Sequence, residues 1–334
     1  MASCASFPSY FPLSFHLQST EFPNSSRSFQ SGTLVFSTRG NQAPSRIRSR
    51  TYFARMESDA SQSSQTVQED VRNVASPSSS FLSVLCPLLK FFGGGDPSQE
   101  RNEVFEVATS SISSFARLPW GSKSLGISSY PSSYLQLYEF EACPFCRRVR
   151  EAMTELDLSA EVFPCPKGSL RHRTMVREIG GKEQFPFMID LNTGVSMYES
   201  GDIVKYLFQQ YGQGRQPSFG LLESTLFTGW VPTLLRAGRG MTIWDQAGKN
   251  PPEQKLELFS YENNPYARIV REALCELELP YILHNVGQGS SKSELLVKLS
   301  GSEEIPYLVD PNTGVQMGDY KKILSYLFRE YSDK

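Results

Sequence analysis

The stretch LYEFEACPFCRRVREA, at residues 137–152, decides the fold, because it returns as LFSYENNPYARIVREA at residues 258–273. Each residue of the second stretch lies 121 positions after its counterpart in the first. Further along the chain the offset becomes 120, and the turn sequence Asn-Thr-Gly-Val then occurs at both 192–195 and 312–315. Solenoid repeats are only about 20–50 residues long, so this repeat predicts two copies of one small domain instead.

The sequence pattern within the first copy, residues 134–212, predicts the element order β-α-β-α-β-β-α. Strand-forming residues at 134–140 precede Pro144, whose fixed backbone suits the first turn of a helix. Apolar residues then recur at the spacing of a helix that faces a core: Val149, Ala152, Met153 and Leu156. A second, charged helix is expected at 169–179. Strand-helix-strand units of this kind imply parallel pairing with right-handed crossovers.

Composition narrows the range of functions. The chain has 334 residues, which is long enough for two domains, and its formal net charge is -2. The chain has no excess of positive charge to attract the phosphates of a nucleic acid, so we expect no nucleic-acid partner. Six cysteines are too few for a disulfide-stapled secreted scaffold, and three histidines do not favour a metal site. Thiol chemistry must therefore come from one or two placed cysteines.

The first 56 residues have the composition of a targeting segment. They are rich in serine, carry six arginines, and contain Glu21 as their only acidic residue. This composition predicts an organellar transit peptide at 1–56. High hydroxyl content and weak amphipathicity favour the chloroplast, most simply its stroma, with the mitochondrion as the alternative. A disordered tail without any address is the remaining interpretation.

Residues 57–133 connect this segment to the first copy. The Ser- and Gln-rich part at 57–80 lacks the apolar surface that folding requires, so we expect disorder there. The apolar stretch at 81–92 is too short to span a bilayer. It is either a flap packed on the domain that follows, which we favour, or an anchor on a membrane surface or a partner. An amphipathic helix is predicted at 101–118. Its expected apolar face consists of Val104, Val107, Ala108, Ile112 and Phe115.

Residues 213–254 link the two copies. Apolar residues dominate the part from 218 to 244, but Pro232 and several charged residues argue against a transmembrane span. An interfacial helix on a membrane is one interpretation. We favour a linker helix that packs across both domains and gives them a shared apolar surface.

The motif Cys143-Pro144-Phe145-Cys146 lies where the first strand ends and the first helix begins. Amide groups and the helix dipole at a helix N-terminus favour a negative charge, so they can lower the pKa of a thiol there. We therefore expect Cys143 to be the nucleophile. Cys146, one helical turn deeper, is expected to be the resolving thiol.

Charged residues surround this motif. Arg147, Arg148 and Arg150 should add positive charge near the Cys143 thiol, whereas Glu141 should oppose its ionisation. A structural zinc site would need two further ligands, and the sequence has no second CxxC or paired histidines. We therefore predict no metal site.

The strand, the CPxC motif, the helix and a later aromatic-Pro-apolar segment resemble glutaredoxins and the N-terminal, thioredoxin-like domain of glutathione S-transferases. The resemblance covers residues 134–212 and 255–332. The whole arrangement is similar to a family of plant plastid proteins with two such domains in tandem. It implies an α/β fold of two tandem thioredoxin-like domains, of which the second is degenerate.

The resemblance also implies a glutathione site in the first copy. Pro186 matches the cis-proline that lies against the active-site thiol in such folds, and Pro306 matches it in the second copy. The backbone of Phe185 would pair with the cysteinyl part of glutathione, while Glu199 and Ser200 match the pair that holds the γ-glutamyl end. A helix N-terminus with a hydroxyl suits a carboxylate. The alternative role for Glu199 and Ser200 is helix capping.

Other residues near this edge of the sheet have two interpretations each. Lys167 could meet the glycine carboxylate of glutathione or be a solvated lysine. Cys165 could serve as a third thiol or be a partly buried cysteine. We expect His172 to lie at the surface. In the second copy neither thiol position is a cysteine, so Cys275 is interpreted as a packing residue and the copy as a structural or substrate-presenting partner.

These observations predict a glutathione-linked thiol-disulfide oxidoreductase of the glutaredoxin kind, with glutathione as co-substrate and a protein or small disulfide as substrate. One alternative is a glutathione-binding or redox-sensing scaffold that does not turn over. Another is a glutathione-dependent transferase or isomerase acting on an apolar substrate, for which the linker would have to form the pocket. Membrane contact is not expected.

Overall fold

The structure is a computed structural model that describes residues 96–99, 102–126 and 130–333. The predicted transit peptide, the polar segment after it and the apolar stretch at 81–92 lie outside the described residues. Within the part of the chain that is described, no helix is long and apolar enough to cross a membrane.

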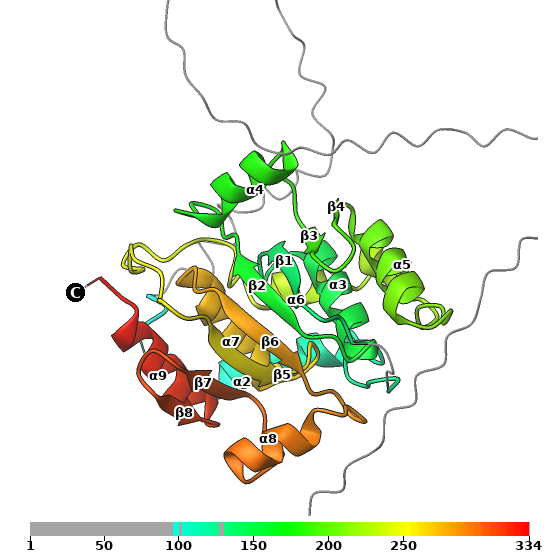
Figure 1. Cartoon of the computed structure of the whole chain (residues 1–334). Helices are drawn as coiled ribbons and strands as arrows, with labels where there is room; N and C mark the ends of the chain where they lie inside the picture. The colour runs from blue at the N-terminus through cyan, green and yellow to red at the C-terminus, as the bar shows by residue number, and fades with distance from the viewer. Residues whose placement is uncertain (1–95, 100–101, 127–129, 334) are drawn as a thin grey trace, which may run out of the picture. The chain divides into compact units, whose positions relative to one another are not determined.

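The first copy folds in the predicted order (Figure 1). Its elements are β1 (Leu135–Glu139), α3 (Pro144–Glu155), β2 (Ala160–Pro164), α4 (His172–Gly180), β3 (Phe187–Asp190), β4 (Val195–Met197) and α5 (Ser200–Tyr211). Strands β1 and β2 pair in parallel, while β3 pairs antiparallel with both β1 and β4. The predicted charged helix begins at His172 rather than at Ser169.

The second copy repeats this arrangement. Its elements are β5 (Leu256–Ser260), α7 (Pro265–Glu276), β6 (Tyr281–Asn285), α8 (Ser293–Ser300), β7 (Tyr307–Asp310), β8 (Val315–Met317) and α9 (Tyr320–Glu330). The same parallel and antiparallel pairings recur. The predicted fold class, two tandem thioredoxin-like α/β domains, is confirmed.

Alternating strand residues divide the core of each domain into two layers. In β1, Leu137 packs into the core that α3 and α5 cover, whereas the next residue, Tyr138, packs on the other face with Val176 of α4. In β5, Leu258 and Phe259 divide in the same way, and Phe259 meets Leu296 of α8. This alternation follows from the two-residue period of a strand.

The two domains share one sheet. Among the described residues, eight strands are ordered β4-β3-β1-β2-β6-β5-β7-β8, and the joint is an antiparallel pairing of β2 with β6. Each of these strands would otherwise be an exposed edge with unpaired amide and carbonyl groups. The joint therefore covers one edge of each domain and relates the domains by an approximate two-fold axis (Figure 1).

Each domain also caps a turn of the other across this joint. Glu278 accepts hydrogen bonds from the backbone amides of Leu170, Arg171 and His172, just before and at the start of α4. Asp157, its counterpart in the first domain, accepts hydrogen bonds in the second domain from the donors Ser290 Oγ, Ser291 N and Lys292 Nζ. Each carboxylate therefore satisfies polar groups at or just before a helix start of the opposite domain.

The expectation that His172 lies at the surface is wrong. Its ring is buried, forms a hydrogen bond between Nδ1 and the carbonyl oxygen of Pro164 at 2.7 Å, and packs edge-on against Phe163. Its position at the start of α4, next to the capping carboxylate of Glu278, turns it inward.

The segment before each domain is repeated too, which the sequence comparison missed. Arg117 donates two hydrogen bonds to Glu151, and Arg236 donates two to Glu272, the corresponding residue of the second domain. Four residues later, Gly121 and Gly240 both adopt positive φ, 68° and 72°. An added Cβ at Gly240 would lie 2.7 Å from the Cβ of Glu141, so this close approach requires glycine.

The linker contacts both domains, as predicted, but it is not one helix. It contains a 3₁₀ turn at Ser224–Leu226 and the five-residue helix α6 (Val231–Leu235). The hydroxyl of Thr233 donates to the carbonyl oxygen of Ala142 in the first domain at 2.5 Å, and Arg236 reaches the second domain. The proline within α6 and glycines on both sides of it explain why the helical pattern breaks.

The predicted helix before the first domain is present as α2 (Glu103–Phe115), but it is turned the opposite way from the prediction. Its buried residues are serines: Ser110, Ser113 and Ser114. Its large apolar residues point outward. The hydroxyl of Ser110 donates to the carbonyl oxygen of Pro265, so the small side chains let α2 approach α7 closely. Close helix packing here outweighs the burial of larger apolar groups.

The cross-domain caps give a first prediction. We expect Glu278→Ala to lower the free energy of unfolding by about 3–5 kcal/mol, because it removes a buried carboxylate and leaves amides of the other domain unpaired. The measurement is urea unfolding followed by circular dichroism.

Glu183→Ala is the matched control, because Glu183 pairs with Arg173 and Arg177 at the surface. It should cost no more than about 1 kcal/mol. Equal losses in the two variants would contradict the assignment of Glu278 as a cross-domain cap.

Candidate functional site

The CPFC motif stands at the junction that the sequence predicted. Cys143 is the N-cap of α3, and its Sγ accepts a hydrogen bond from the backbone amide of Cys146 at 3.3 Å. Pro144 occupies the first turn, where its missing amide costs no hydrogen bond. Both cysteines are free thiols, and their exposed fractions are only 2% and 0%.

The two thiols differ in acidity. Burial raises the pKa of the Cys143 thiol, but hydrogen bonds from the Cys146 thiol and from the amides of Cys146 and Phe145 outweigh it, so its pKa lies below the ordinary value. Burial and the neighbouring Cys143 sulfur raise the pKa of Cys146 well above its ordinary value. The thiolate therefore forms on the first cysteine of the motif.

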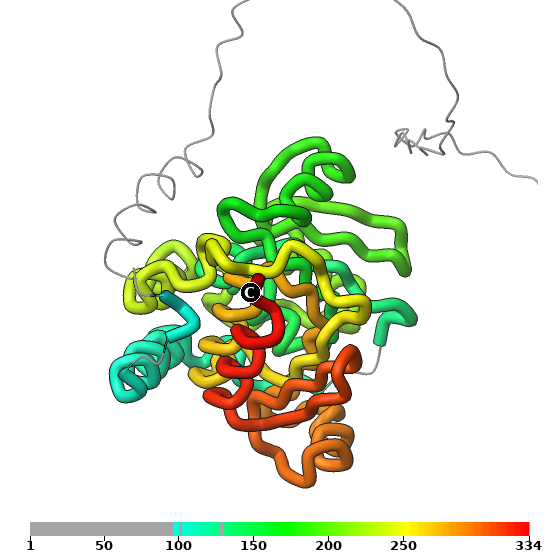
Figure 2. The backbone as a smooth tube through the Cα atoms, turned by 90° about the vertical axis from the view of Figure 1, so that its left-hand side faces the viewer, coloured from blue at the N-terminus to red at the C-terminus, as the bar shows by residue number. Residues whose placement is uncertain are grey.

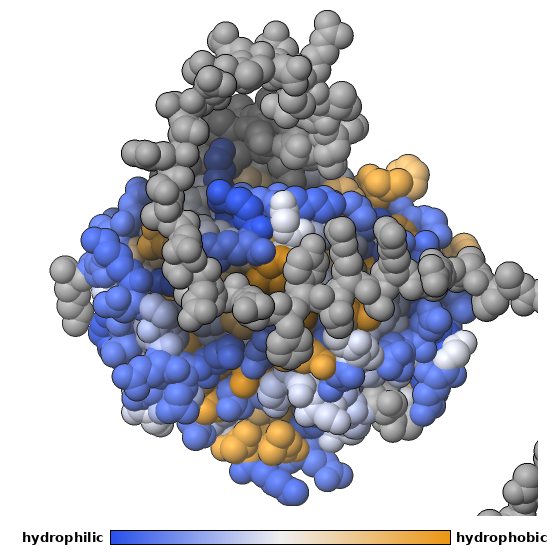
Figure 3. Space-filling model, turned by 45° about the horizontal axis from the view of Figure 1, so that its top comes forward, coloured by the Kyte–Doolittle hydropathy of each residue, from blue (hydrophilic) through white to orange (hydrophobic). Residues whose placement is uncertain are grey.

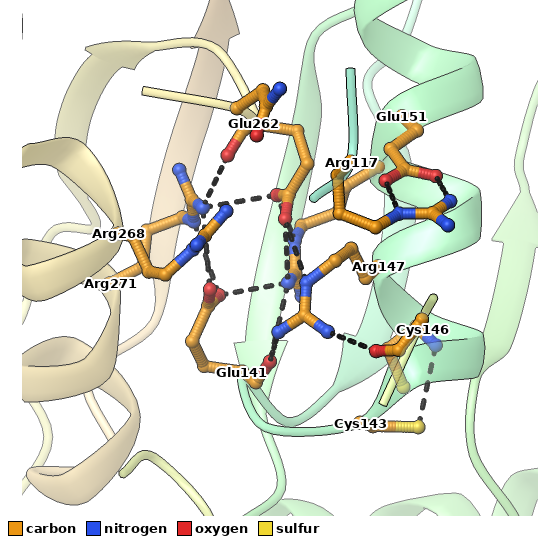
Figure 4. A network of polar contacts seen from close by, with 12 residues as sticks. Arg117, Glu141, Cys143, Cys146, Arg147, Glu151, Glu262, Arg268 and Arg271 are labelled. Atoms are coloured by element: carbon orange, nitrogen blue, oxygen red, sulfur yellow. Dashed lines mark hydrogen bonds and ion pairs between the residues drawn. The ribbon is translucent and has the colours of Figure 1, made fainter. Parts of the chain in front are cut away.

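The arginines after the motif do not serve Cys143 in the way the sequence suggested. Arg150 contacts the carboxylates of Glu139, Glu141 and Glu262, the last across the domain boundary. Arg147 lies 3.4 Å from Glu262 and donates to the carbonyl oxygen of Gly229. Both guanidinium groups are therefore engaged by carboxylates or a carbonyl oxygen rather than by the Cys143 thiol. Figure 4 shows Arg147 among these partners.

A matching contact returns from the second domain. Arg271, the counterpart of Arg150, pairs with Glu141 at 3.1 Å and with Glu262 at 3.1 Å. Figure 4 shows these side chains meeting between the two domains, beside the loop that carries Cys143. We call Arg150, Arg271, Glu141 and Glu262 the central ion network. All four are almost fully buried.

The carboxylate that opposes ionisation of Cys143 is Glu139, not Glu141. Glu139 is buried at the end of β1, and its charge raises the pKa of Cys143. Burial raises the pKa of Glu139 itself to about 7, although Arg150 acts against this shift. Glu141 is held between Arg150 and Arg271, so its charge is compensated.

The linker forms part of the site, which the sequence did not reveal. Met241 packs in one apolar cluster with Cys143 and Cys146. The Trp230 ring meets Phe145 edge-on, with ring centroids 6.3 Å apart. The thiols are therefore covered by the segment that joins the two domains.

The residues predicted for glutathione lie around the same edge of the sheet. The Phe185–Pro186 bond is cis, as is Ile305–Pro306 in the second domain, and both agree with the expectation. Phe185 packs beside the cluster of Cys143 and Cys146. Glu199 is exposed, has φ of 65°, and accepts a hydrogen bond from Gln184.

Ser200 begins α5 but does not act as its N-cap. Its buried hydroxyl accepts a hydrogen bond from Arg148 Nη1 at 3.2 Å, and Arg148 also donates to Thr225 in the linker. The sequence placed Arg148 near the thiol but did not predict this link between the starts of α3 and α5. Arg147 and Arg150, close to it in sequence, instead contact Glu262 at the domain boundary. Their different roles could be assigned only from the structure.

Of the remaining candidates, Lys167 has an exposed side chain, while its backbone pairs with Met241 and Ile243 of the linker. Cys165 is fully buried, its thiol donates to the carbonyl oxygen of Phe163, and burial raises its pKa well above the ordinary value. Of the two interpretations for Cys165, the geometry supports a buried packing cysteine.

The second domain keeps the geometry of the junction without the thiols. Asn264 caps α7, and its Oδ1 accepts the amide hydrogen of Ala267 at 2.8 Å, as Cys143 does for Cys146. Asp319 caps α9 through its own carboxylate. Cys275 is a packing residue, as predicted, but it belongs to the same apolar cluster as Cys143 and Cys146 of the first domain, which was not expected.

The match to a family model agrees with this architecture. Two segments, 137–216 and 258–334, match the family model described as glutathione S-transferase, N-terminal domain. No curated protein matches the chain. A solved structure, the Leishmania protein TDR1, described as a unique trimeric glutathione transferase, matches with 14% identity over 60% of this chain and 68% of its own, with a TM-score of 0.23. The two thioredoxin-like domains are thus similar to the N-terminal domain of glutathione S-transferases.

The thiol geometry predicts how the second cysteine tunes the first. Cys146→Ala removes a side-chain hydrogen-bond donor, so the pKa of Cys143 should rise. Cys146→Ser keeps a hydroxyl donor and should raise that pKa less. The measurement is the thiolate ultraviolet absorbance of each variant against pH. Equal pKa values for Cys143 in the two variants would contradict a donor role for the Cys146 side chain.

Buried Glu139 predicts a pH dependence of stability. Its pKa rises from 4.5 to about 7 on folding, so the folded chain binds more protons between these values and stability falls as pH rises through this window. Glu139→Gln mimics the protonated acid, so its stability should fall less between pH 4.5 and 7.

Urea unfolding at a series of pH values checks this prediction, with Glu183→Gln as an exposed control. Parallel stability curves for the unaltered chain and for Glu139→Gln would show that Glu139 titrates normally.

Proposed function

We propose that this chain is a glutathione-linked thiol-disulfide oxidoreductase, with Cys143 as nucleophile and Cys146 as resolving thiol. One observation carries the proposal: Cys143 caps the N-terminus of α3, and its Sγ accepts the backbone amide of Cys146 at 3.3 Å. The pKa of Cys143 is accordingly lowered and that of Cys146 raised. A thiolate next to a protonated thiol is the arrangement that disulfide exchange requires. The family-model match supports a glutathione-related function in general.

The proposed reaction begins when the Cys143 thiolate attacks one sulfur of a substrate disulfide. A bond forms between the two sulfurs, the substrate disulfide breaks, and the leaving thiolate takes a proton. Cys146 then loses its proton and attacks the mixed disulfide at Cys143, which releases the second substrate thiol and leaves a Cys143–Cys146 disulfide. Two glutathione molecules reduce this disulfide and leave as glutathione disulfide, so two electrons pass from glutathione to the substrate.

A substrate that is itself a mixed disulfide with glutathione permits a shorter route. Cys143 takes the glutathionyl group and releases the substrate thiol. A second glutathione then attacks this new mixed disulfide, restores the Cys143 thiolate and leaves as glutathione disulfide. This route does not use Cys146 as a nucleophile.

The proposed glutathione position uses the edge formed by Phe185, Pro186, Glu199, Ser200 and Lys167. Phe185, the residue before Pro186, packs beside the thiol cluster, and we place the cysteinyl part of glutathione against the Phe185 backbone. The start of α5 offers its amide groups to the γ-glutamyl carboxylate. Arg148, which contacts Ser200, adds positive charge at that end, and Lys167 would face the glycine carboxylate.

Substrate access requires the linker to move, because Cys143 is 2% exposed beneath residues that include Met241. The same burial favours a second candidate function, a redox-sensing scaffold that forms a mixed disulfide but does not turn over. A transferase or isomerase is supported only by the apolar contact of Trp230 with Phe145 beside the motif.

We also propose that the protein acts in the chloroplast stroma of a plant, on the composition of residues 1–56. Fusion of these residues to a fluorescent protein in leaf cells tests this location. Fluorescence in mitochondria would support the alternative address, and fluorescence in the cytosol would contradict both.

Turnover of a glutathionylated peptide with glutathione tests the reaction. Cys143→Ser should lower kcat/KM by at least about a hundredfold, because it removes the nucleophile. Cys146→Ser should keep turnover by the shorter route. The measurement is a glutathione reductase-coupled assay that follows consumption of the reduced nicotinamide cofactor.

Cys165→Ala is the matched control, because it removes another buried thiol of the same domain that the reaction does not use. Undiminished turnover in Cys143→Ser would contradict the proposed nucleophile. A mixed disulfide on Cys143 that forms once without turnover would instead favour the redox-sensing scaffold.

A further inference from the structure

The outward side of α2 carries large apolar residues that the described part of the chain leaves open to solvent. They continue past the end of the helix, and the linker beside it carries more. We call this surface the outer apolar face: Val104, Phe105, Ile112, Phe115, Leu118, Leu226, Phe227 and Leu234, whose exposed fractions lie between 51% and 80%. On another view of the molecule, apolar side chains reach the surface in small groups between polar areas (Figure 3).

The helix and the linker that make up this face are held together by arginines. Arg236 donates to the carbonyl oxygen of Glu106 and to Thr109 Oγ1 in α2. Arg117, just after α2, donates to Ser224 Oγ and Thr228 Oγ1 in the linker. Figure 2 shows α2, in cyan, at the periphery of the body and beside the yellow-green linker. The face is therefore a surface of fixed geometry.

The described part of the chain places nothing over this surface. A large exposed apolar area in a soluble protein generally marks a contact site. The serines on the inner side of α2 are tightly packed against the second domain, so the helix cannot rotate to bury its apolar side. This side of the helix is therefore available as a contact site.

We propose that residues 81–92 of this same chain cover the outer apolar face. Nine of these twelve residues are apolar, in the sequence FLSVLCPLLKFF. Phe92 lies ten residues before Asn102, the N-cap of α2. Ten residues can extend about 34 Å. The helix itself is 13 residues long, or about 20 Å. The connecting chain thus reaches every part of α2.

Covalent connection favours this occupant over others. A short tether holds a segment at an effective concentration of about millimolar near its target, whereas a second copy must be collected from solution. The stretch is too short to span a bilayer, which needs about 20 apolar residues. This inference does not depend on the proposed thiol chemistry.

Cys86, within the stretch, serves as a reporter. The full chain is treated with iodoacetamide, and modification of the Cys86 peptide is followed by mass spectrometry. We expect slow modification in the unaltered chain. The double variant Ile112→Glu, Phe115→Glu places two charges on the face and should speed modification of Cys86 at least about tenfold, because it releases the segment.

Ile179→Glu is the matched control, since Ile179 on α4 is 53% exposed, close to the 55% of Ile112. Helix α4 lies away from α2 in both Figure 1 and Figure 2. This variant should leave the modification rate of Cys86 unchanged. Deleting residues 81–92 should in turn increase binding of a dye that fluoresces on apolar surfaces.

Three outcomes would overturn the proposal. Cys86 that reacts as fast in the unaltered chain as in urea is not covered. Protection that grows with protein concentration, together with dimers in sedimentation, would assign the face to a second copy. Protection that occurs only with vesicles of anionic phospholipid would assign the stretch to a membrane surface.

Discussion

The central ion network is the interaction on which the rest of the structure depends. Arg150 and Glu262 come from different domains, and their atoms Nε and Oε2 lie 2.7 Å apart with almost no exposure to solvent. A buried charge without its partner is strongly unfavourable, so neither domain could keep this arrangement alone. The network, the β2–β6 joint and the cross-domain caps therefore make the two domains one structural unit.

The CPFC motif occurs in the first domain of this unit and has no counterpart in the second. The N-cap of α3 is Cys143 and that of α7 is Asn264, and each side chain accepts the same backbone hydrogen bond. The second domain keeps the backbone geometry and has no thiol there. Its contribution is made through Arg271, which compensates the charge of Glu141, and through Cys275, which belongs to the apolar cluster around the two thiols.

Much of the fold could be predicted from local pattern. Pro144 and the apolar spacing after it predicted α3, and the internal repeat predicted the second domain. The roles of Arg147 and Arg150 could not be predicted, because their carboxylate partner Glu262 lies more than 100 residues away in the sequence. The predicted orientation of α2 was wrong, because hydrophobic periodicity does not reveal that serines can allow a closer helix contact.

The most direct test of this account is a double-mutant cycle on Arg150→Met and Glu262→Gln, measured by urea unfolding. Each single change should cost about 3–5 kcal/mol, because it leaves a buried charge unpaired. Together they should cost less than the sum by about 1–3 kcal/mol, the sign of direct contact. Losses that add to within about 0.5 kcal/mol would contradict a central ion network that joins the two domains.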